Sequence, residues 1–410
     1  MTTRALRRLG CASALALAAP ALGAADYGDA DVLVRTGDGL EVATMDGAFG
    51  IRLNGRLMFD TVYFQDDRVD FHSGTEIRRA RLDVSGTVAF DWDYRLEVGF
   101  ANDEVDIADA WLGYRTGPVN RLRVGQFKAP MSLEEQTSSL HLTFLERALP
   151  NALVPDRRLG LGLFAHSDRW TLAAAVVGSE GDTEDDDDED DEGWGAGLRA
   201  TVAPLAARRR ALHLGMSANY HSPGQEESPR IRARPEAHIT DTRLVDTDDL
   251  EDIDHVWRGG LEAAAIMGPW SAQGEFLAAR FQTRDGVYRR FHGGYAYVSY
   301  FLTGENRDYQ PDDGEFGRID TIIHGYGAWE IALRWSQLDL QDADIDGGRQ
   351  ENWTLAVNWY PARNLRFMLN HVRASASPVT REDGNLPDGT PADLTEDKPN
   401  VWQLRAQVDF

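Results

Sequence analysis

Apolar and polar residues alternate with a period of two from Ile51 onward, in segments separated by polar or Gly/Pro turns. A β-strand has this period because its successive side chains point to opposite faces of the sheet. In the segment 51–64, one face is mainly aliphatic and aromatic, while the other carries Arg52, Arg56 and Asp60. A water-soluble sandwich alternates in the same way. Charge in the middle of strand after strand, however, is typical of a membrane barrel with a polar lumen.

The alternation predicts an even number of strands, each about long enough to cross a bilayer at a tilt. The sixteen expected strands lie near residues 51–64, 77–90, 93–101, 107–115, 120–127, 158–167, 169–178, 194–204, 210–221, 256–267, 270–282, 290–303, 326–338, 352–361, 364–374 and 400–410. The sequence therefore predicts an all-β fold, a transmembrane antiparallel β-barrel of about 16 strands.

Short and long connections alternate along the chain, as they do in outer-membrane barrels with tight turns at one end and long loops at the other. Asp91-Trp92 and Gly268-Pro269 are tight turns. The long loops are expected at 128–157, 179–193, 222–255 and 375–399. One connection, 304–325, is long although it falls on the side of the short turns.

The stretch 125–155 is too long for an ordinary hairpin connection, and loops of this length are usually functional or disordered. It contains large apolar residues such as Phe127, Phe144 and Leu145, a short helical turn at 133–137, and three prolines. A loop of this composition needs a surface to pack against. We therefore expect it to fold inward over a cavity as a constriction loop.

Composition divides the chain into three parts. Residues 1–25 combine a basic start, an apolar run and small residues near the end, as a cleaved signal peptide does. We expect 26–50 to be an N-terminal periplasmic segment and 51–410 to be the barrel domain. Tryptophans near strand ends, Trp111 included, are expected in the interfacial girdles. The last strand ends on Phe410, which resembles the C-terminal assembly signature of outer-membrane barrels, so the expected location is the bacterial outer membrane.

The charge of the chain is strongly acidic, with a formal net charge of −25 at pH 7, and this argues against nucleic acid as a partner. Lys128 and Lys398 are the only lysines, so nearly all positive charge is arginine. The single cysteine, Cys11, lies in the expected signal peptide, which leaves the mature chain without a thiol for a metal site or a nucleophile. No cofactor is expected.

Several short motifs, taken jointly and in order, resemble the phosphate-selective porin O and P family of Gram-negative outer membranes. The motifs are Gly55-Arg56-Leu57, Arg78-Arg79-Ala80, Gly125-Gln126-Phe127-Lys128, Leu133-Glu134, Thr137-Ser138-Ser139, Glu146-Arg147, Phe301-Leu302-Thr303-Gly304-Glu305, Gly327-Ala328-Trp329-Glu330 and Val357-Asn358-Trp359-Tyr360. The resemblance covers nearly the whole mature chain. It implies a sixteen-stranded homotrimeric barrel in outer-membrane lipid, an anion-conducting pore, and inward-folded loops at 128–157, 222–255 and 304–325.

The resemblance also implies a ladder of lumenal arginines that replaces the hydration of an anion, such as phosphate or polyphosphate, in a narrow pore. The candidate pore-lining residues are Arg56, Arg78, Arg79, Arg81, Lys128, Arg230, Arg232 and Arg234. Strand alternation places Arg79 and Arg81 on one face. Arg78 then faces the other way unless a bulge or the strand end intervenes.

One position departs from the family pattern. In phosphate-selective members a lysine follows the Leu-Glu of the constriction loop, whereas this chain has Glu135 there. Asp109 maps next to the position of an eyelet acid. A carboxylate at the eyelet repels phosphate, so the alternative function is a general or cation-favouring porin. A third hypothesis is an outer-membrane enzyme or adhesin, although no serine nucleophile that pairs with a histidine is visible in the sequence.

Two acidic segments have other possible roles. Residues 342–347 resemble the start of a calcium loop, but its twelfth position is Trp353 where a glutamate is required, so an acidic surface turn is favoured. The run 182–192 contains ten acids and is expected to form a solvated external loop that attracts counter-ions.

Overall fold

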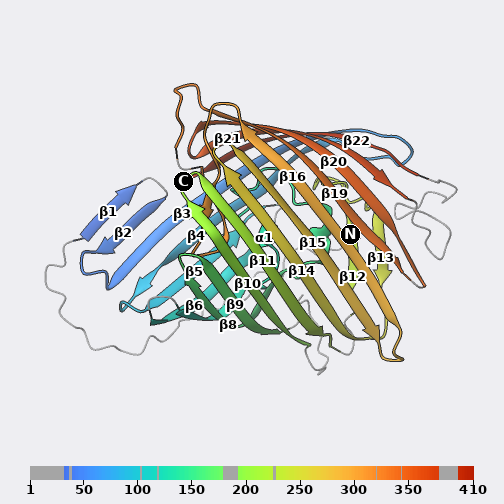
Figure 1. Cartoon of the computed structure of the whole chain (residues 1–410), viewed down its shortest axis with the longest axis horizontal. Helices are drawn as coiled ribbons and strands as arrows, with labels where there is room; N and C mark the ends of the chain where they lie inside the picture. Colours follow the sequence, from blue (N-terminus) through green and yellow to red (C-terminus); the bar gives the residue numbers. More distant parts are fainter. Residues whose placement is uncertain are drawn as a thin grey trace, which may run out of the picture.

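The computed structural model describes residues 32–36, 39–101, 104–117, 120–178, 193–224, 228–319, 321–342, 344–377 and 396–410. The expected signal peptide and the acidic run 182–192 lie outside these residues. Sixteen of the described strands form one closed antiparallel barrel (Figure 1). Among the described residues, no helix is both long and apolar enough to cross a membrane.

The barrel strands follow one another around the wall in chain order, each paired antiparallel with the next. They are β3 (Phe49–Gln65), β4 (Gly74–Val88), β5 (Trp92–Gly99), β6 (Asp106–Gly117), β7 (Asn120–Lys128), β8 (Arg157–Ser167), β9 (Trp170–Gly178), β10 (Trp194–Ala207), β11 (Arg210–Ser222), β14 (Ile253–Met267), β15 (Trp270–Thr283), β16 (Tyr288–Phe301), β19 (Ala328–Asp342), β20 (Ile345–Ala362), β21 (Leu365–Ala376) and β22 (Asn400–Asp409). The sixteen predicted strands are thus confirmed, with boundaries that shift by a few residues and by up to seven at the start of β20.

The barrel closes where the last strand pairs with the first. The β22–β3 register runs from Asn400 opposite Gln65 to Asp409 opposite Arg56. Phe410 extends this pairing, because its N–H donates to the Gly55 carbonyl at 3.1 Å and its carbonyl accepts from the Gly55 N–H at 3.0 Å. The short hairpin of β1 (Val32–Thr36) and β2 (Leu40–Thr44) continues the sheet beyond one end, where β2 pairs with residues 50–53 of β3 (Figure 1).

The burial pattern is that of a barrel whose outside is apolar. Outward side chains such as Leu57, Phe59 and Leu161 are exposed, while inward Arg334 and Arg405 are buried. Exposed tryptophans form part of the outer surface: Trp92, Trp170, Trp194, Trp257, Trp270, Trp329, Trp353 and Trp402. The expectation for Trp111 was wrong. Trp111 shares the inward face of β6 with Asp109, two residues earlier, and its ring packs against the apolar cluster that contains Phe127.

A second bulge decides the direction of Arg78. In the β3–β4 pairing, Met58 is opposite Arg79 but the next residue, Phe59, is opposite Ile77, so Arg78 is the extra residue. An extra residue in one strand shifts its alternation by one position. Arg78 and Arg79 can therefore both reach the lumen. The sequence analysis allowed this only if a bulge interrupted the strand, and the bulge is present.

Connections folded inward occupy part of the lumen. After β7, the chain forms the helix α1 (Leu133–Gln136) and the 3₁₀ turn η1 (Leu149–Leu153). Between β11 and β14 it forms the hairpin β12 (Arg230–Ala233) and β13 (Val245–Asp249), and between β16 and β19 the hairpin β17 (Asp308–Gln310) and β18 (Glu315–Gly317). Met131, Leu149 and Leu153 form one apolar core with the β12–β13 hairpin and with wall residues from β14–β16 and β19.

The closure seam generates a first prediction. A Cβ at Gly55 would overlap the Phe410 ring, so we expect Gly55→Ala to displace that ring and to lower the free energy of unfolding by about 1–3 kcal/mol. The matched control is Gly50→Ala on the same strand, where the new Cβ would lie 3.6 Å from Ala43. Urea unfolding in lipid measures both, and equal stability of the two variants would contradict the prediction.

Candidate pore constriction

The constriction loop, residues 129–156, follows a strand whose path depends on a glycine. Gly125 on β7 has φ +128°, and a Cβ there would overlap the backbone of Ala110 on the neighbouring strand. Ser132 then caps α1, since its hydroxyl accepts from the Glu135 N–H at 3.2 Å. The Glu275 carboxylate on β15 accepts from the N–H groups of Leu133 and Glu134 at 3.0 and 2.7 Å. The barrel wall therefore supplies acceptors for the first free N–H groups of the helix.

Arginine and asparagine side chains of the wall strands β19–β22 donate hydrogen bonds to carbonyl groups of the loop residues 142–146. Arg366 donates to Leu142 at 2.6 Å, Arg405 to Leu145 at 2.6 Å, and Arg334 to Glu146 at 3.0 Å. Asn358 adds a bond of 2.9 Å to the Thr143 carbonyl. Buried carbonyl groups need such partners, because losing a hydrogen bond inside a protein costs about 1–3 kcal/mol. The loop is consequently clamped to β19–β22.

Glu146 joins the two sides of this clamp. Its carboxylate receives two bonds from Arg78, at 2.8 and 3.0 Å, and one of 2.8 Å from Arg405. Burial alone disfavours a charged carboxylate, yet these guanidinium groups hold the pKa of Glu146 well below its usual range. Arg405 also forms a bidentate pair with Asp60, at 2.7 and 2.6 Å. Arg78 thus contacts the loop itself.

With the loop held on that side, a cavity of about 560 Å³ remains along β3–β10. Its lining contains eleven basic side chains: Arg56, Arg79, Arg81, Arg95, Arg115, Arg121, Arg123, Lys128, Arg147, Arg157 and Arg199. Only five acids line it: Glu97, Asp109, Asp312, Asp313 and Glu315. The basic excess is local, because the whole chain carries a net charge of −25.

Ion pairs fix most of the basic side chains in place. Glu97 contacts Arg56 at 3.1 Å and Arg81 at 2.8 Å, and Asp109 contacts Arg157 at 2.9 Å. Arg79 and Arg123 differ from the other nine lining cations, since no carboxylate oxygen lies within 4.0 Å of either in the described chain. These two are therefore the lining cations without a direct carboxylate partner among the described residues.

Arg123 is stacked between two aromatic rings. Its guanidinium carbon lies 4.4 Å from the centre of the Trp111 ring and 4.2 Å from that of Phe164. Stacking fixes the plane of a guanidinium group without using its N–H donors. The inward turn of Trp111 therefore gives this aromatic residue a place in the cavity wall.

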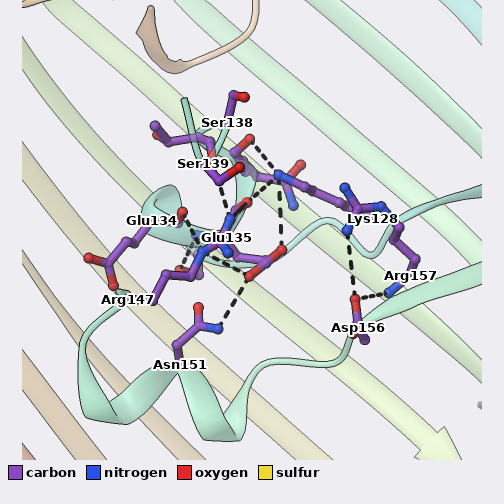
Figure 2. Close-up of polar contacts among 12 residues, drawn as sticks. Lys128, Glu134, Glu135, Ser138, Ser139, Arg147, Asn151, Asp156 and Arg157 are labelled. Carbon is purple, nitrogen blue, oxygen red and sulfur yellow. Dashed lines mark hydrogen bonds and ion pairs between the residues drawn. The ribbon is translucent and has the colours of Figure 1, made fainter. Parts of the chain in front are cut away.

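Glu135 does not line the cavity, and its carboxylate lies behind the lining residues Lys128 and Arg147 (Figure 2). Its carboxylate lies 3.1 Å from Arg147 and 3.9 Å from Lys128, and it accepts a bond of 3.2 Å from Asn151. Although burial opposes ionisation, Arg147 and Lys128 lower the pKa of Glu135. Lys128 lines the cavity and donates to the Glu135 and Gln136 carbonyls, so its ammonium group also supports the end of α1.

Five of the candidate residues named from the sequence line the cavity, and the others lie outside its lining. Arg56, Arg79, Arg81, Lys128 and Asp109 line the cavity. Arg78 on β4 does not line the cavity, because its guanidinium group is bound to Glu146 of the loop. The other three arginines belong to the hairpin β12–β13 and its flank, also outside the cavity lining. Arg230 contacts Asp246 at 2.7 Å, Arg234 contacts Asp241 at 3.3 Å, and Arg232 lies exposed between them on β12.

Sequence reasoning did not single out seven of the basic lining residues, which are Arg95, Arg115, Arg121, Arg123, Arg147, Arg157 and Arg199. Alternation was the available signal for those on strands, because each occupies an inward position. Arg147 has no such signal, since its direction depends on how the loop folds. Among the described residues, no group of three or more His, Cys, Asp or Glu side chains has the arrangement of a metal site.

The arrangement defines a class of protein: a sixteen-stranded porin with a constriction loop. Solved structures of the same fold include outer-membrane-expressed OmpT of Vibrio cholerae, 12% identical, covering 92% of this chain and 100% of that one with a TM-score of 0.54. An anion-selective porin from Comamonas acidovorans is 11% identical and covers 87% of this chain and 99% of that one, also with a TM-score of 0.54. At these identities the likeness concerns the fold alone.

Comparison of sequences identifies the family of the chain. The family model for phosphate-selective porin O and P matches residues 49–410, so the chain belongs to this family. Porin O of Pseudomonas aeruginosa is 28% identical over 91% of this chain and 94% of its own. An uncharacterized protein of Caulobacter vibrioides is 33% identical over 82% of this chain and 68% of its own. The protein is thus an outer-membrane porin, and family and fold point to a channel rather than an enzyme.

The clamp generates a second prediction. Arg405→Met leaves Asp60 with a buried charge and no guanidinium partner, so we expect a loss of roughly 3–5 kcal/mol in the free energy of unfolding. Single-channel recordings should also show a noisier open current, because the Leu145 carbonyl loses its donor. Arg52→Met is the control, since its pair with Glu41 is exposed at the surface. A stable variant with a quiet current would contradict the proposed clamp.

Proposed function

We propose that this porin is a passive diffusion channel for small anions, phosphate included, and that the anions pass along the arginine-rich cavity beside the constriction loop. The observation that supports this most directly is the lining of the cavity, with eleven basic and five acidic side chains in a chain that is strongly acidic overall. Local charge of this kind raises the concentration of anions at the constriction.

Physical chemistry assigns different roles to the lining residues. An anion that enters a narrow passage loses part of its hydration, and guanidinium N–H groups replace the lost hydrogen bonds. Arg79 and Arg123 are the strongest candidates for direct contact, because no carboxylate occupies their donors within 4.0 Å in the described chain. The paired residues Arg56, Arg81 and Arg157 contribute fixed donors whose charge is largely compensated.

The cation-favouring alternative rested on Glu135 at the constriction. The contacts of Glu135 argue against that role, because Arg147 and Lys128 neutralise its carboxylate and it does not line the cavity. Asp109 does line the cavity, but Arg157 and Arg95 lie 2.9 and 3.3 Å from it. Neither acid presents an uncompensated charge to a passing ion.

The proposals that phosphate is a permeant ion and that the protein is a homotrimer rest on similarity to other porins. The family description names phosphate selectivity, and one related solved structure is an anion-selective porin. Phosphate and polyphosphate suit bidentate guanidinium donors, which match two oxygens of a phosphate group at once. One solved OmpT structure is a trimer form, and we propose a homotrimer here as well.

A third prediction tests the direction of selectivity. In a planar bilayer under a potassium chloride gradient, the zero-current potential of the purified protein should show a preference for chloride. Phosphate added stepwise should reduce the chloride current, because it occupies the same donors. A preference for potassium without any block by phosphate would overturn the proposal and favour a general or cation-selective porin.

A fourth prediction concerns Arg79, which lacks a direct carboxylate partner in the described chain. Arg79→Gln should lower the chloride-to-potassium permeability ratio by roughly two- to five-fold, the effect of one unit charge near the ion path in a largely aqueous lumen. Arg79→Lys should keep most of the ratio, since it keeps the charge.

Two matched variants locate this effect. Arg52→Gln removes the same charge at the exposed end of β3 and should change the ratio little. Glu135→Gln should raise the ratio little, because its carboxylate lies against Arg147 and does not line the cavity, whereas removing a carboxylate from the ion path would raise it strongly. If Arg79→Gln behaved like Arg52→Gln, the ion path would not run past Arg79.

A further inference from the structure

The hairpin β17–β18 enters the lumen from the end with the short turns, where a brief connection would have sufficed. Its turn lies against the wall strands β9 and β10. Arg199 on β10 donates to the Gly314 carbonyl at 2.8 Å, and a Cβ at Gly314 would lie 2.9 Å from Thr201 and 3.0 Å from Thr171. Gly314 also has φ +64°, a conformation that glycine adopts at little cost. The contact therefore fixes the depth of the hairpin in the barrel.

The two strands of the hairpin pack on neighbouring groups from both sides. Phe316 is buried with Leu133 of α1, and its N–H donates to the Thr137 hydroxyl at 3.5 Å. Arg307 stacks on the Phe316 ring with its guanidinium carbon 3.6 Å from the ring centre. On the other side, Tyr309 contacts His213 of β11 through a hydrogen bond of 2.8 Å. The hairpin is consequently one packed unit with the constriction loop.

This unit carries three of the five acids that line the cavity, Asp312, Asp313 and Glu315. The other two, Glu97 and Asp109, are each paired with arginine. Glu315 is half-buried, and within the described chain no arginine or lysine nitrogen lies within 4.0 Å of its carboxylate. A carboxylate placed in the basic cavity without a close partner adds directly to the field along the ion path.

We propose that Glu315 is a specificity-determining residue of the channel, whose protonated form favours anion passage and whose ionised form opposes it. The inference rests on the proposed function for the meaning of the cavity as an ion path. It goes beyond that function by making the strength of anion selectivity depend on pH. The hairpin then contributes charge to the constriction in addition to occupying part of the lumen.

The environment of Glu315 supports a change of charge near neutral pH. Burial and the neighbouring Asp313 raise the pKa of Glu315 to about 7, against the opposing effect of Lys128, Arg199 and Arg95. Below this pH the carboxyl group is mostly neutral, so the basic side chains act without its opposing charge. Above it, one negative charge appears in the cavity, so anion preference should fall as the pH rises.

Other charged and titratable groups face the same space. They are Asp313 and Tyr309 on the hairpin, Arg95, Lys128, Arg199 and the His213–Glu262 pair on the wall, and Arg147 with Glu135 in the loop. His166 also lines the cavity, 3.6 Å from Asp312. An imidazole in the cavity is a second proton-binding group, so Glu315 is tested in a protein that lacks it.

The fifth prediction therefore uses a His166→Gln background. With His166→Gln, the chloride-to-potassium permeability ratio should fall by roughly two- to five-fold between pH 5.5 and 8.5, the effect of one added charge. With His166→Gln and Glu315→Gln together, the ratio should stay near its low-pH value across the range. His166→Gln with Glu104→Gln is the matched control, because Glu104 is an exposed carboxylate outside the cavity lining.

The outcomes separate the inference from the proposed function. A pH-dependent ratio that Glu315→Gln abolishes and Glu104→Gln preserves supports the role of Glu315, whatever ion the protein prefers at neutral pH. The same pH dependence with and without Glu315 overturns the inference while leaving anion selectivity intact. A ratio independent of pH in the His166→Gln protein overturns it as well. Heat-modified migration on gels confirms that each variant is folded before its selectivity is compared.

Discussion

The position of the ion path depends on one constraint, which is that a loop buried inside a barrel must find partners for its backbone. The carbonyl groups of Leu142, Leu145 and Glu146 have no partners in a helix or sheet of their own loop. Arginines of β19–β22 donate to them, and Glu275 of β15 accepts from the start of α1. Because all these partners lie on one side of the barrel, the loop is held there and the free volume remains along β3–β10.

The same side chains explain how so much charge is buried at acceptable cost. A buried guanidinium group is stable when carboxylates or carbonyls occupy its donors. Most lumenal arginines are used in this way, as Arg405 is by Asp60 and Glu146. A few are left without a carboxylate, and these determine the field of the cavity. Selectivity in this barrel thus depends less on the number of arginines than on which of them lack acidic partners.

The two inward connections have complementary effects on the cavity. The constriction loop brings Lys128 and Arg147 to its edge and keeps Glu135 out of the lining. The hairpin β17–β18 brings Asp312, Asp313 and Glu315 into it from the end with the short turns. They pack on each other through Phe316 and Leu133, so a displacement of one is expected to move the other. The electrostatics of the path are therefore a joint property of both segments.

The sequence by itself determined the strands, the apolar outer face and the inward direction of residues such as Arg56 and Arg81, because alternation is a local property of an extended chain. Tertiary structure decided what depends on register and on distant partners. A bulge opposite Met58 turned Arg78 inward, which plain alternation beside Arg79 does not give. Arg147, Glu135 and Glu315 have no periodic signal, since the direction of a side chain in a folded loop follows from the groups that the loop packs against. Local pattern fixes which face a strand residue occupies, whereas the charge balance of the lumen depends on pairs that lie tens or hundreds of residues apart.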